Sequence, residues 1–356
     1  MKLLFSYDIF YLQKYGGISS YFANLAKKFL ENQKDVNIPC ALHKNSNLQN
    51  LNKIVDGYKI YYPHFFNNIV GKVNNLFFTK KINIIKPNVI HYTYFNNNFS
   101  KIKDIKKIIN CWDFTHEKFD KNSNLNKLKK LNYLEADKII CPSYTVKNDL
   151  LNYYNLHEDK VKVTYFSSDF EIEHNKTKTL QNHILYVGSR SNYKNFEKFI
   201  ESFSLSEKLK KDFNLIIFGG ENSSLNGLDI LKKYNIKRNK FQFINGTNND
   251  LKYYYKNVRL FIYPSRYEGF GIPLVESMRM GCPIISSNGG ALKEIAGDGI
   301  TYFDPDNVED IKFKLESTIY DETKLTNTIN YGYERCKKYS WKNCAKETYD
   351  TYESLL

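Results

Sequence analysis

Short β-rich runs alternate with longer helical stretches along nearly the whole chain of 356 residues. This alternation predicts parallel sheets, because two parallel neighbouring strands need a long, usually helical, crossover between them. The strand candidates of the first half are Lys2–Asp8, Val36–Leu42, Val89–Thr93, Lys107–Trp112, Lys138–Pro142 and Val161–Phe166. A second series consists of Ile184–Gly188, Asn214–Phe218, Phe241–Ile244, Leu260–Pro264 and Pro283–Ser286.

Helical patterns fill the intervals between these strands. They cover Ile18–Leu30, Asn124–Ala136, Tyr144–Tyr154, Phe196–Leu209, Asn226–Tyr234, Asn248–Asn257, Pro273–Met280 and Ala291–Ala296. A polar segment without periodicity, Ser167–Asn182, separates the two series and is the predicted linker. The chain also exceeds the length at which one core usually stops growing. We therefore predict an α/β fold of two Rossmann-like, doubly wound domains, residues 1–170 and 171–340, with a terminal helix, 341–356, packing back on the first.

The net charge of +14 favours anionic partners, and nucleic acid, anionic lipid and phosphorylated small molecules all satisfy it. Residues 1–175 hold 25 Lys, no Arg and 16 acidic residues, whereas all six Arg lie in the second half, from Arg190 onward. Lys suits a diffuse solvated charge and Arg a geometrically defined contact. Because nucleic-acid binding would favour clustered Arg with interleaved aromatics, we expect no nucleic-acid partner.

Neither a membrane-spanning run of about 18 apolar residues nor a signal peptide is recognisable in the sequence. The six cysteines form no Cys-x-x-Cys pair and read as buried thiols in a reducing compartment. The expected location is the cytoplasm.

The most informative segment is Tyr263–Glu276, which directly follows a predicted strand. Gly269 and Gly271 remove side chains from the turn and let a ligand approach the backbone. Pro273 fits the first turn of a helix, whose unpaired amides would face the carboxyl end of the sheet. Such a helix N-terminus is a site for phosphate.

Two carboxylates flank this predicted anion site, Glu268 before the turn and Glu276 in the following helix. A carboxylate repels phosphate, so its natural partners here are hydroxyl groups. The pair therefore points to a ligand that carries both a phosphate and hydroxyls, such as a ribose and a sugar.

At this point the sequence resembles a family. Glu268-Gly-Phe-Gly-Ile-Pro-Leu-Val-Glu276 is similar to the signature of the family 4 (group 1) glycosyltransferases of the GT-B fold. The resemblance continues in the glycine loop at Tyr15–Tyr21, the basic motif at Val187–Asn195 and the segment Met280–Ile285. It implies transfer of a sugar from a nucleotide diphosphate sugar to a hydroxyl of a glycan or lipid-linked glycan, with retention of configuration. Mannose-type donors and cell-surface polysaccharide or lipopolysaccharide synthesis are the expected setting.

The resemblance also implies roles for single residues. Arg190 and Lys194 would stabilise the diphosphate leaving group in place of a metal ion, and no Asp-x-Asp cluster accompanies them, so we expect no metal and no other cofactor. The implied catalytic residues are Glu268, Arg190, Lys194, Asp113 and His116. The implied donor-binding residues are Gly16, Gly17, Gly269, Phe270, Gly271, Ile272 and Glu276.

Two positions depart from the pattern of relatives. Trp112 precedes Asp113 where many relatives have His, and His116 follows three residues later. Ser20 stands where relatives often carry Arg. His91, at the end of a predicted strand, is a further histidine that faces the crevice by position.

The stretch Phe65–Ile85 mixes apolar residues with Lys72, Lys80 and Lys81 at roughly helical spacing. Together with the family's lipid-linked acceptors, this predicts peripheral contact with an anionic membrane, at the inner face of the cytoplasmic membrane. Two alternatives remain open: a GT-B nucleotide-sugar epimerase or phosphorylase-like enzyme, and, more remotely, a nucleic-acid-binding protein.

Overall fold

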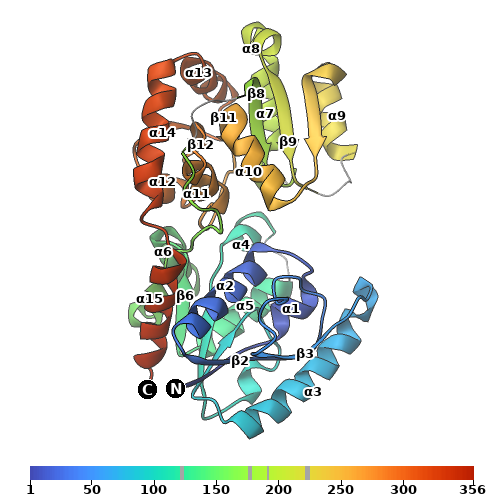
Figure 1. Cartoon of the computed structure of the whole chain (residues 1–356), viewed down its shortest axis with the longest axis vertical. Coiled ribbons are helices and arrows are strands. Elements are labelled where there is room, and N and C mark those ends of the chain that lie inside the picture. Colours follow the sequence, from blue (N-terminus) through green and yellow to red (C-terminus); the bar gives the residue numbers. More distant parts are fainter. Residues whose placement is uncertain (121–123, 175–178, 191, 221–224) are drawn as a thin grey trace. The chain divides into compact units, whose positions relative to one another are not determined.

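The computed structural model describes residues 1–120, 124–174, 179–190, 192–220 and 225–356 (Figure 1). The chain forms two compact units. Unit 1 comprises Met1–Phe166 and Ser340–Leu356, and unit 2 comprises Ser167–Tyr339. Each unit contains one parallel sheet with helices packed against it, which confirms the predicted α/β class.

The sheet of unit 1 has seven parallel strands in the order β3-β2-β1-β4-β5-β6-β7. The strands are β1 (Lys2–Phe5), β2 (Asp35–His43), β3 (Val55–Lys59), β4 (Val89–Tyr92), β5 (Lys106–Asn110), β6 (Lys138–Cys141) and β7 (Val161–Val163). The register places Leu3 of β1 between Val36 and Val89 of its two neighbours, and all three side chains are buried.

Strand β3 was not predicted because it is a half-exposed edge strand without regular apolar alternation. Its Gly57 has a φ of +154°, and a Cβ there would lie 1.8 Å from the carbonyl oxygen of Cys40. Only glycine allows this close approach to β2.

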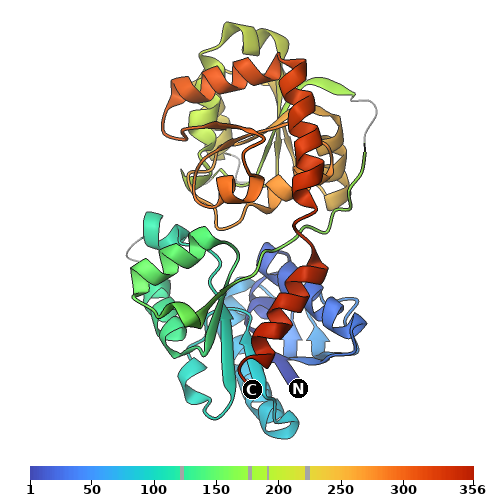
Figure 2. The ribbon, with the colours of Figure 1, turned by 90° about the vertical axis from the view of Figure 1, so that its left-hand side faces the viewer.

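The α-helices of unit 1 are α1 (Asp8–Leu12), α2 (Gly17–Glu31), α3 (Asn67–Ile85), α4 (Thr115–Phe119), α5 (Asn124–Glu135), α6 (Tyr144–Tyr154) and α15 (Trp341–Glu353). Short 3-10 turns lie at His64–Phe66, Phe99–Lys101 and Glu158–Lys160. Helix α15 packs against α2, where Phe29 meets Tyr349 with ring centroids 5.6 Å apart (Figure 2). The last helix of the chain thus completes unit 1.

The sheet of unit 2 has six parallel strands in the order β10-β9-β8-β11-β12-β13. The strands are β8 (Leu180–Val187), β9 (Asn214–Phe218), β10 (Phe241–Ile244), β11 (Val258–Tyr263), β12 (Ile284–Ser287) and β13 (Thr301–Phe303). Ile184 of the central strand β8 pairs with Leu215 and Leu260, so the core is built around that strand.

The helices of unit 2 are α7 (Phe196–Ser204), α8 (Glu207–Asp212), α9 (Leu225–Lys233), α10 (Asn248–Asn257), α11 (Ile272–Arg279), α12 (Leu292–Ala296), α13 (Val308–Ile319) and α14 (Glu322–Cys336). The 3-10 turns are Asn192–Lys194 and Arg238–Lys240. Helix α7 packs against α9 and α13, while α11 packs against α10, α12 and α14. The single helix expected over Phe196–Leu209 is two helices, because Ser206 caps α8 by accepting a hydrogen bond from the amide of Leu209.

The chain passes from unit 1 into unit 2 at the start of the predicted linker, Ser167–Asn182, and the first residues of that segment are packed within unit 2. Ser167 and Phe170 are each 1% exposed. The guanidinium of Arg279 donates hydrogen bonds to the carbonyl oxygens of Phe170 and Tyr339 and, over 3.1 Å, to Oγ of Ser167. Buried carbonyls that need a donor explain why this segment is held in unit 2. Residues 175–178 of the predicted linker lie outside the described residues.

The strand order of each sheet reverses direction once, between β1 and β4 in unit 1 and between β8 and β11 in unit 2. In open parallel sheets the crossovers on the two sides of such a point lie on opposite faces, which leaves a crevice at the carboxyl ends of the two strands. The loops that follow β1, β4, β8 and β11 are therefore where ligand contacts are expected.

Candidate active site

The loops that follow β8 and β11 meet at the reversal point of unit 2. Nζ of Lys194, in the first loop, lies 2.6 Å from Oε1 of Glu268, in the second. The two side chains are 16% and 14% exposed, and the hydroxyl of Tyr263 lies 3.5 Å from the same ammonium. The structure thus brings together two predicted site residues that are 74 positions apart in the chain.

Opposing effects act on the charge of Lys194. Burial disfavours its ammonium form, but the carboxylate of Glu268 and the nearby phenols of Tyr263 and Tyr193 favour it, and the net result is a raised pKa. Lys194 is therefore positively charged throughout the physiological pH range. A permanent, mostly buried cation at a strand end is suited to an anionic ligand.

Arg190 lies on the other side of the β8 loop. Its Nη1 donates a 2.6 Å hydrogen bond to the carbonyl oxygen of Gly219, and its guanidinium stacks over the ring of Phe243 at 4.9 Å. Gly220 has a φ of +83°, and a Cβ there would lie 1.8 Å from Nη1 of Arg190. Among the described residues, Nε of Arg190 is buried without a hydrogen-bond partner.

No hydrogen bond within the described ranges joins Arg190 to Lys194 or Glu268. Arg190 and Glu268 nevertheless both act on the phenol of Tyr186. Burial raises the pKa of Tyr186, the charge of Arg190 lowers it, and the charge of Glu268 raises it. Arg190 and Glu268 therefore have a common neighbour, although Arg190 is held by the backbone carbonyl of Gly219 and not by the ion pair.

The glycine turn opens helix α11 as predicted. Gly271 has a φ of +90° and precedes Ile272, the first residue of the helix, and Pro273 follows in its first turn. A Cβ on Gly271 would lie 2.8 Å from Cδ2 of Leu292. The side chain of Phe270 is 4% exposed and packs on Tyr339, with ring centroids 5.5 Å apart. Its predicted part in donor binding can therefore come only from its backbone.

Glu276 lies on α11, with Oε2 3.4 Å from the hydroxyl of Tyr255, which donates to it. Burial raises the pKa of Glu276 to about 7, the Tyr255 hydrogen bond lowers it, and the charge of Asp169 raises it. Glu276 already accepts one hydrogen bond, from Tyr255, and its carboxyl oxygens can accept a further hydrogen bond from a hydroxyl group of a ligand. This fits the hydroxyl-binding role that the sequence suggested.

A second glycine pair, which our sequence reasoning did not select, fixes the Glu268 loop. Gly290 has a φ of +59°, and a Cβ there would lie 2.5 Å from the carbonyl oxygen of Glu268. A Cβ on Gly289 would lie 2.3 Å from the carbonyl oxygen of Arg266, and the amide of Ala291 donates to the carbonyl oxygen of Glu268 over 2.9 Å. Two adjacent glycines shortly after β12 were the sequence feature that could have indicated this close backbone contact.

In unit 1, Gly16 and Gly17 begin helix α2 after the loop that follows β1 and α1. Gly16 is the residue before the helix, with an extended backbone that any residue can adopt. A Cβ there would lie 2.2 Å from Oε1 of Gln13, a flexible side-chain end. Gly17 is exposed at the helix N-terminus.

Asp113 and His116 occupy the loop after β5 and the short helix α4. Oδ1 of Asp113 accepts a 2.8 Å hydrogen bond from the amide of Thr115, so the carboxylate holds the start of α4. The side chain of His116 is 45% exposed, and its Nδ1 lies 4.0 Å from Oδ2 of Asp120. No hydrogen bond between described residues joins Asp113 to His116.

The neighbour of His116, Glu117, is a buried anchor. Its carboxylate pairs with Nζ of Lys129 at 3.0 Å, and the two side chains are 1% and 4% exposed. The hydroxyl of Tyr154 donates to Oε1 of Glu117 over 2.8 Å. This pair ties α4, which carries His116, to α5 and α6.

Trp112 and His91 are packing residues. The Trp112 ring lies 5.2 Å from Tyr21 and 5.5 Å from Phe166, so it is part of an aromatic cluster. Nε2 of His91 lies 2.5 Å from Oδ1 of Asn110, and its Nδ1 lies 2.6 Å from the hydroxyl of Tyr352. Burial lowers the pKa of His91 to about 3, so this imidazole stays neutral and connects α15 to the sheet.

Sequence reasoning also passed over Asp8, directly after β1. Asp8 is 4% exposed, its Oδ2 accepts from Oγ of Ser6 at 2.5 Å, and its Oδ1 accepts from Nδ2 of Asn96 at 2.7 Å. Burial raises the pKa of Asp8 to about 7, while the hydrogen bonds from Ser6 and Asn96 lower it. Asp8 follows β1 and Asn96 follows β4, and these two strands flank the reversal point of the sheet. Polar residues after both strands were the sequence feature that could have indicated a site here.

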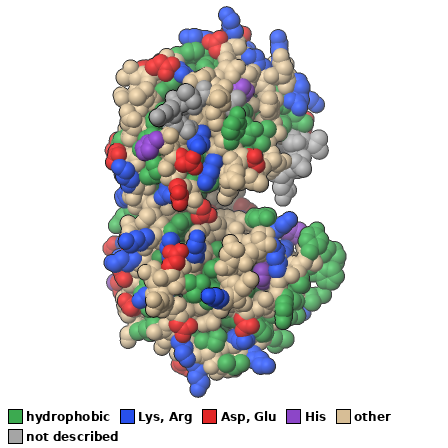
Figure 3. Space-filling model, viewed as in Figure 1, with side chains coloured by type: hydrophobic (Ala, Val, Ile, Leu, Met, Phe, Trp, Pro, Cys, Tyr) green, Lys and Arg blue, Asp and Glu red, His purple; other side chains and the backbone are tan. Residues whose placement is uncertain are grey.

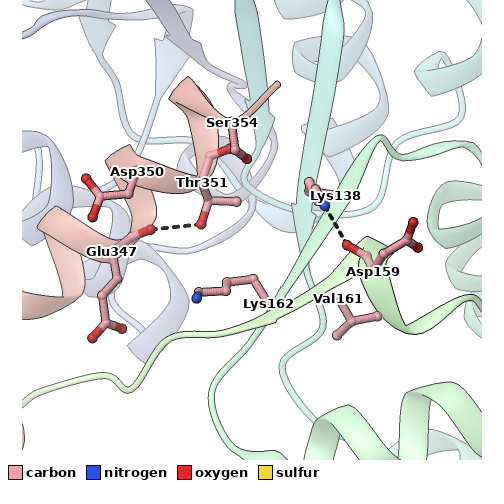
Figure 4. A pocket seen from close by; sticks show the side chains of 8 residues that line it. All are labelled: Lys138, Asp159, Val161, Lys162, Glu347, Asp350, Thr351 and Ser354. Carbon is pink, nitrogen blue, oxygen red and sulfur yellow. Dashed lines mark hydrogen bonds between the residues drawn. The ribbon is translucent and has the colours of Figure 1, made fainter. Parts of the chain in front are cut away.

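A cavity lies beside α15, at the edge of the unit 1 sheet opposite to Asp8 (Figure 4). Its volume is about 200 Å³, and it is lined by residues that include Lys138, Lys162, Glu347 and Asp350. Lys138 and Val161 begin their strands, so this cavity is at the amino ends and away from the ligand-binding edge. Across the described part of the chain, no group of three His, Cys, Asp or Glu side chains is arranged to hold a metal ion.

Two family models together match residues 15–335. The model described as Glycosyltransferase Family 4 matches residues 15–166, and the model described as Glycosyl transferases group 1 matches residues 167–335. Their junction falls at the boundary between unit 1 and unit 2.

Curated relatives include O-antigen chain mannosyltransferase B of Escherichia coli, 29% identical over 49% of this chain and 46% of the relative. The O-antigen chain mannosyltransferase RfbU of Salmonella typhimurium is 29% identical over 61% of this chain and 59% of the relative. The chain thus spans about half the length of these two relatives.

Solved structures share the fold over the full chain. Sucrose-phosphate synthase from Thermosynechococcus elongatus matches with a TM-score of 0.79 at 15% identity. The match covers 100% of this chain and 99% of the synthase chain. HepE of Anabaena in complex with UDP-glucose has a TM-score of 0.78 at 17% identity and covers 99% and 100%. The two matched models, which follow one another along the chain, and the shared fold lead to one assignment: the chain belongs to the family 4 (group 1) glycosyltransferases, with the GT-B fold.

Proposed function

We propose that this protein transfers a sugar, of the mannose type, from a nucleotide diphosphate sugar to a hydroxyl group of a glycan or lipid-linked glycan. The observation that carries the proposal is the buried Lys194–Glu268 pair at the reversal point of the unit 2 sheet, beside the turn that opens α11. Relatives named O-antigen mannosyltransferases and a fold neighbour bound to UDP-glucose support this substrate class and a role in cell-surface polysaccharide or lipopolysaccharide synthesis.

In the proposed reaction the bond between the sugar's anomeric carbon and the diphosphate breaks, and a bond from that carbon to the acceptor oxygen forms on the same face. The acceptor's proton passes to the departing phosphate oxygen, so the configuration is retained and no separate carboxylate base is required. Lys194, Arg190 and the first amides of α11 stabilise the negative charge that builds up on the diphosphate without a metal ion. Glu268 faces the positive charge that develops on the sugar.

The remaining predicted residues receive supporting roles in this proposal. Glu276 accepts a hydrogen bond from a hydroxyl of the donor's ribose. The backbone at Gly269 and Gly271, with Gly16 and Gly17 of unit 1, lets the donor approach the main chain closely. Asp113 and His116 orient the acceptor or the transferred sugar.

Replacing Glu276 with Gln tests the donor site. The amide cannot offer the ribose a charged acceptor, so we expect the dissociation constant of the matching nucleotide sugar to rise at least about tenfold. A panel of nucleotide sugars is first screened by thermal shift, since the matching donor stabilises the fold by mass action, and calorimetry then measures the constant. Glu207→Gln, an exposed first-turn carboxylate of α8, is the control and should bind as the wild type does.

An unchanged donor affinity in Glu276→Gln would remove this residue from the site. Incubation with donor alone, followed by product analysis, separates transfer from epimerisation, because an epimerase converts its substrate without an acceptor.

We also propose that unit 1 docks on an anionic membrane through the outer face of α3, at the cytoplasmic side. Three apolar side chains of α3 share that face, Ile69, Val73 and Leu76, which are 59%, 40% and 73% exposed. Phe65, 74% exposed, lies in the 3-10 turn that precedes the helix. The opposite face is the one that packs on the unit, through Val70, Asn74, Phe78 and Ile82. Figure 3 shows hydrophobic side chains gathered over α3.

The charge around this face supports a lipid surface as the partner. From Gly57 to Lys103 the sequence contains no Asp or Glu but seven Lys, at 59, 72, 80, 81, 86, 101 and 103. Lys72 and Lys80 are exposed on α3, and each Lys near an anionic leaflet is worth about 1 kcal/mol. Tyr58 and Tyr61, 77% and 89% exposed, precede the helix and have the amphipathic rings found at membrane interfaces. Within the described residues, no helix is both long enough and apolar enough to span a bilayer.

Sedimentation with vesicles tests this docking surface. We expect the protein to pellet with phosphatidylcholine–phosphatidylglycerol vesicles and to stay in the supernatant with phosphatidylcholine alone. Leu76→Glu and the double variant Lys72→Gln/Lys80→Gln should each reduce binding at least about tenfold, because each removes one of the two contributions. The double variant Lys342→Gln/Lys346→Gln, with two exposed lysines of α15, is the matched control.

Binding that is equal on neutral and anionic vesicles, or that is reduced as much by the α15 variant as by the α3 variant, would contradict the proposal. A dimer in light scattering that Leu76→Glu dissociates would instead identify the face as a contact between two copies.

A further inference from the structure

The reversal point of the unit 1 sheet holds a cavity of about 210 Å³ that no known role accounts for. We call it the Asp8 cavity. It lies among α1, the first half of α3 and the loop after β4. Its lining consists of Tyr7, Asp8, Tyr11, Asn67, Asn68, Gly71, Lys72, Asn75, Phe95, Asn96, Asn97 and Asn98. Asp8 follows β1 and Asn96 follows β4, so the cavity is at the carboxyl ends of the two strands where open parallel sheets bind ligands.

The polar groups of the Asp8 cavity are held in place by one another. Asn96 donates to the buried carboxylate of Asp8 over 2.7 Å, and its Oδ1 accepts from the amide of Asn98 over 2.6 Å. Oδ1 of Asn75 accepts from Nδ2 of Asn98 over 3.0 Å and from the hydroxyl of Tyr7 over 3.5 Å. The side-chain amide of Asn132 holds the backbone of Asn96: its Oδ1 accepts from the amide of Asn96 over 2.8 Å, and its Nδ2 donates to the carbonyl oxygen of Asn96 over 3.1 Å. A prearranged set of this kind binds a ligand without losing side-chain freedom on binding.

Helix α3 approaches the cavity closely because of a glycine. Gly71 lies in the interior of α3, where glycine costs about 1 kcal/mol relative to alanine. A Cβ there would lie 3.1 Å from the hydroxyl and 3.3 Å from Cζ of Tyr11. The rings of Tyr7 and Tyr11 lie 5.8 Å apart and form an aromatic wall. The glycine therefore serves to bring α3 against that wall.

The chemistry of the lining selects the ligand. Six of the twelve lining residues are asparagines, which present both donors and acceptors, and the single carboxylate and single lysine leave little net charge. Nδ2 of Asn75 has no hydrogen-bond partner among the described residues, and neither Asn68 nor Asn97 makes a side-chain hydrogen bond there. A phosphate would meet the carboxylate of Asp8. An uncharged ring with several hydroxyls satisfies the amides and packs its apolar face on tyrosine.

We propose that the Asp8 cavity binds a neutral hexose ring, and that this ring is a sugar of the glycan acceptor. The second half of the proposal rests on the proposed glycosyl transfer; the first half, a hexose site, does not.

The test is direct binding of simple sugars to the full chain. Saturation-transfer NMR is recorded with D-mannose, D-glucose, D-galactose and N-acetylglucosamine, each alone, and we expect at least one to receive saturation from the wild-type protein. The affinity for that sugar should fall about tenfold in Asn75→Ala, which removes two hydrogen-bonding groups, and in Asp8→Asn. Asn152→Ala, an exposed asparagine of helix α6 in the same unit, should bind as the wild type does.

The possible outcomes test the hexose site and its assignment to the acceptor separately. The hexose site is overturned if none of the four sugars binds. It is also overturned if a sugar binds and its affinity is the same in Asn75→Ala, Asp8→Asn and the wild type. Thermal unfolding of both variants is recorded to check that they fold. Asn75 is half-buried, so Asn75→Ala still tests the site if Asp8→Asn does not fold. If sugar binding depends on Asn75 but no nucleotide sugar is bound or consumed, the proposed function fails and the hexose site stands. If transfer occurs with the same acceptor KM in Asn75→Ala and wild type, the acceptor assignment fails and the function stands.

Discussion

Replacing Lys194 with alanine is expected to lower the rate of sugar transfer by about 10²- to 10³-fold. The ammonium group is 16% exposed, is paired with Glu268 at 2.6 Å and is charged at every physiological pH. In the proposed reaction it meets a diphosphate whose negative charge grows as the sugar leaves. A fixed cation in a site with little water stabilises that charge more strongly than it stabilises the intact donor, so its loss lowers kcat/KM.

Initial rates with a saturating acceptor measure this effect. Lys194→Arg keeps a positive charge and should recover part of the rate. Lys198→Ala is the matched control, since Lys198 lies four residues further on, in α7, and is 3.9 Å from an exposed carboxylate of Asp306. A Lys194→Ala protein that is folded by circular dichroism and transfers within about fivefold of wild type would contradict the assignment.

Replacing Lys129 with methionine is expected to lower the free energy of unfolding of unit 1 by about 3–5 kcal/mol. Lys129 and Glu117 are 4% and 1% exposed as side chains, and the carboxylate also accepts from Tyr154. Removing the ammonium leaves a charge buried without its counter-ion, which costs far more than the intact pair contributes. Methionine fills most of the space that the lysine side chain occupied. The expected loss of stability therefore comes mainly from the unpaired charge of Glu117.

Urea denaturation at neutral pH measures this loss. The double variant Lys129→Met/Glu117→Gln removes both charges and keeps an acceptor for Tyr154, so it should recover most of the stability. Lys106→Met is the control, because Lys106 pairs with Asp137 at the surface, 46% exposed, and such pairs are worth about 1 kcal/mol or less. A single variant that loses under about 1 kcal/mol, or a double variant as unstable as the single one, would show that the pair does not behave as a buried ion pair.

Sequence patterns predicted the strands of the described residues except β3 and β13. The inner strand β9 (Asn214–Phe218) and the edge strand β10 (Phe241–Ile244) were predicted at their observed bounds, because a mainly apolar run between turns is a strong signal. The edge strands β3 and β13 were missed, because β3 has no regular apolar alternation and β13 is only three residues long. The polarity of the segment after Phe166 did not indicate that its first residues are packed, because Arg279, more than a hundred positions away, satisfies their carbonyls.

The family, the order of the motifs and the positions of Lys194 and Glu268 in loops after two strands could be predicted from the sequence. These follow from local patterns, because a strand, a glycine turn and a helix start are each encoded within about ten residues. Which distant residues come into contact depends on how the chain folds. The Lys194–Glu268 contact, the Glu117–Lys129 pair and the Asp8 cavity, where α1 meets α3 and the β4 loop, depend on strand order and register. Spacing along a chain does not specify these contacts, because crossovers set which carboxyl ends become neighbours.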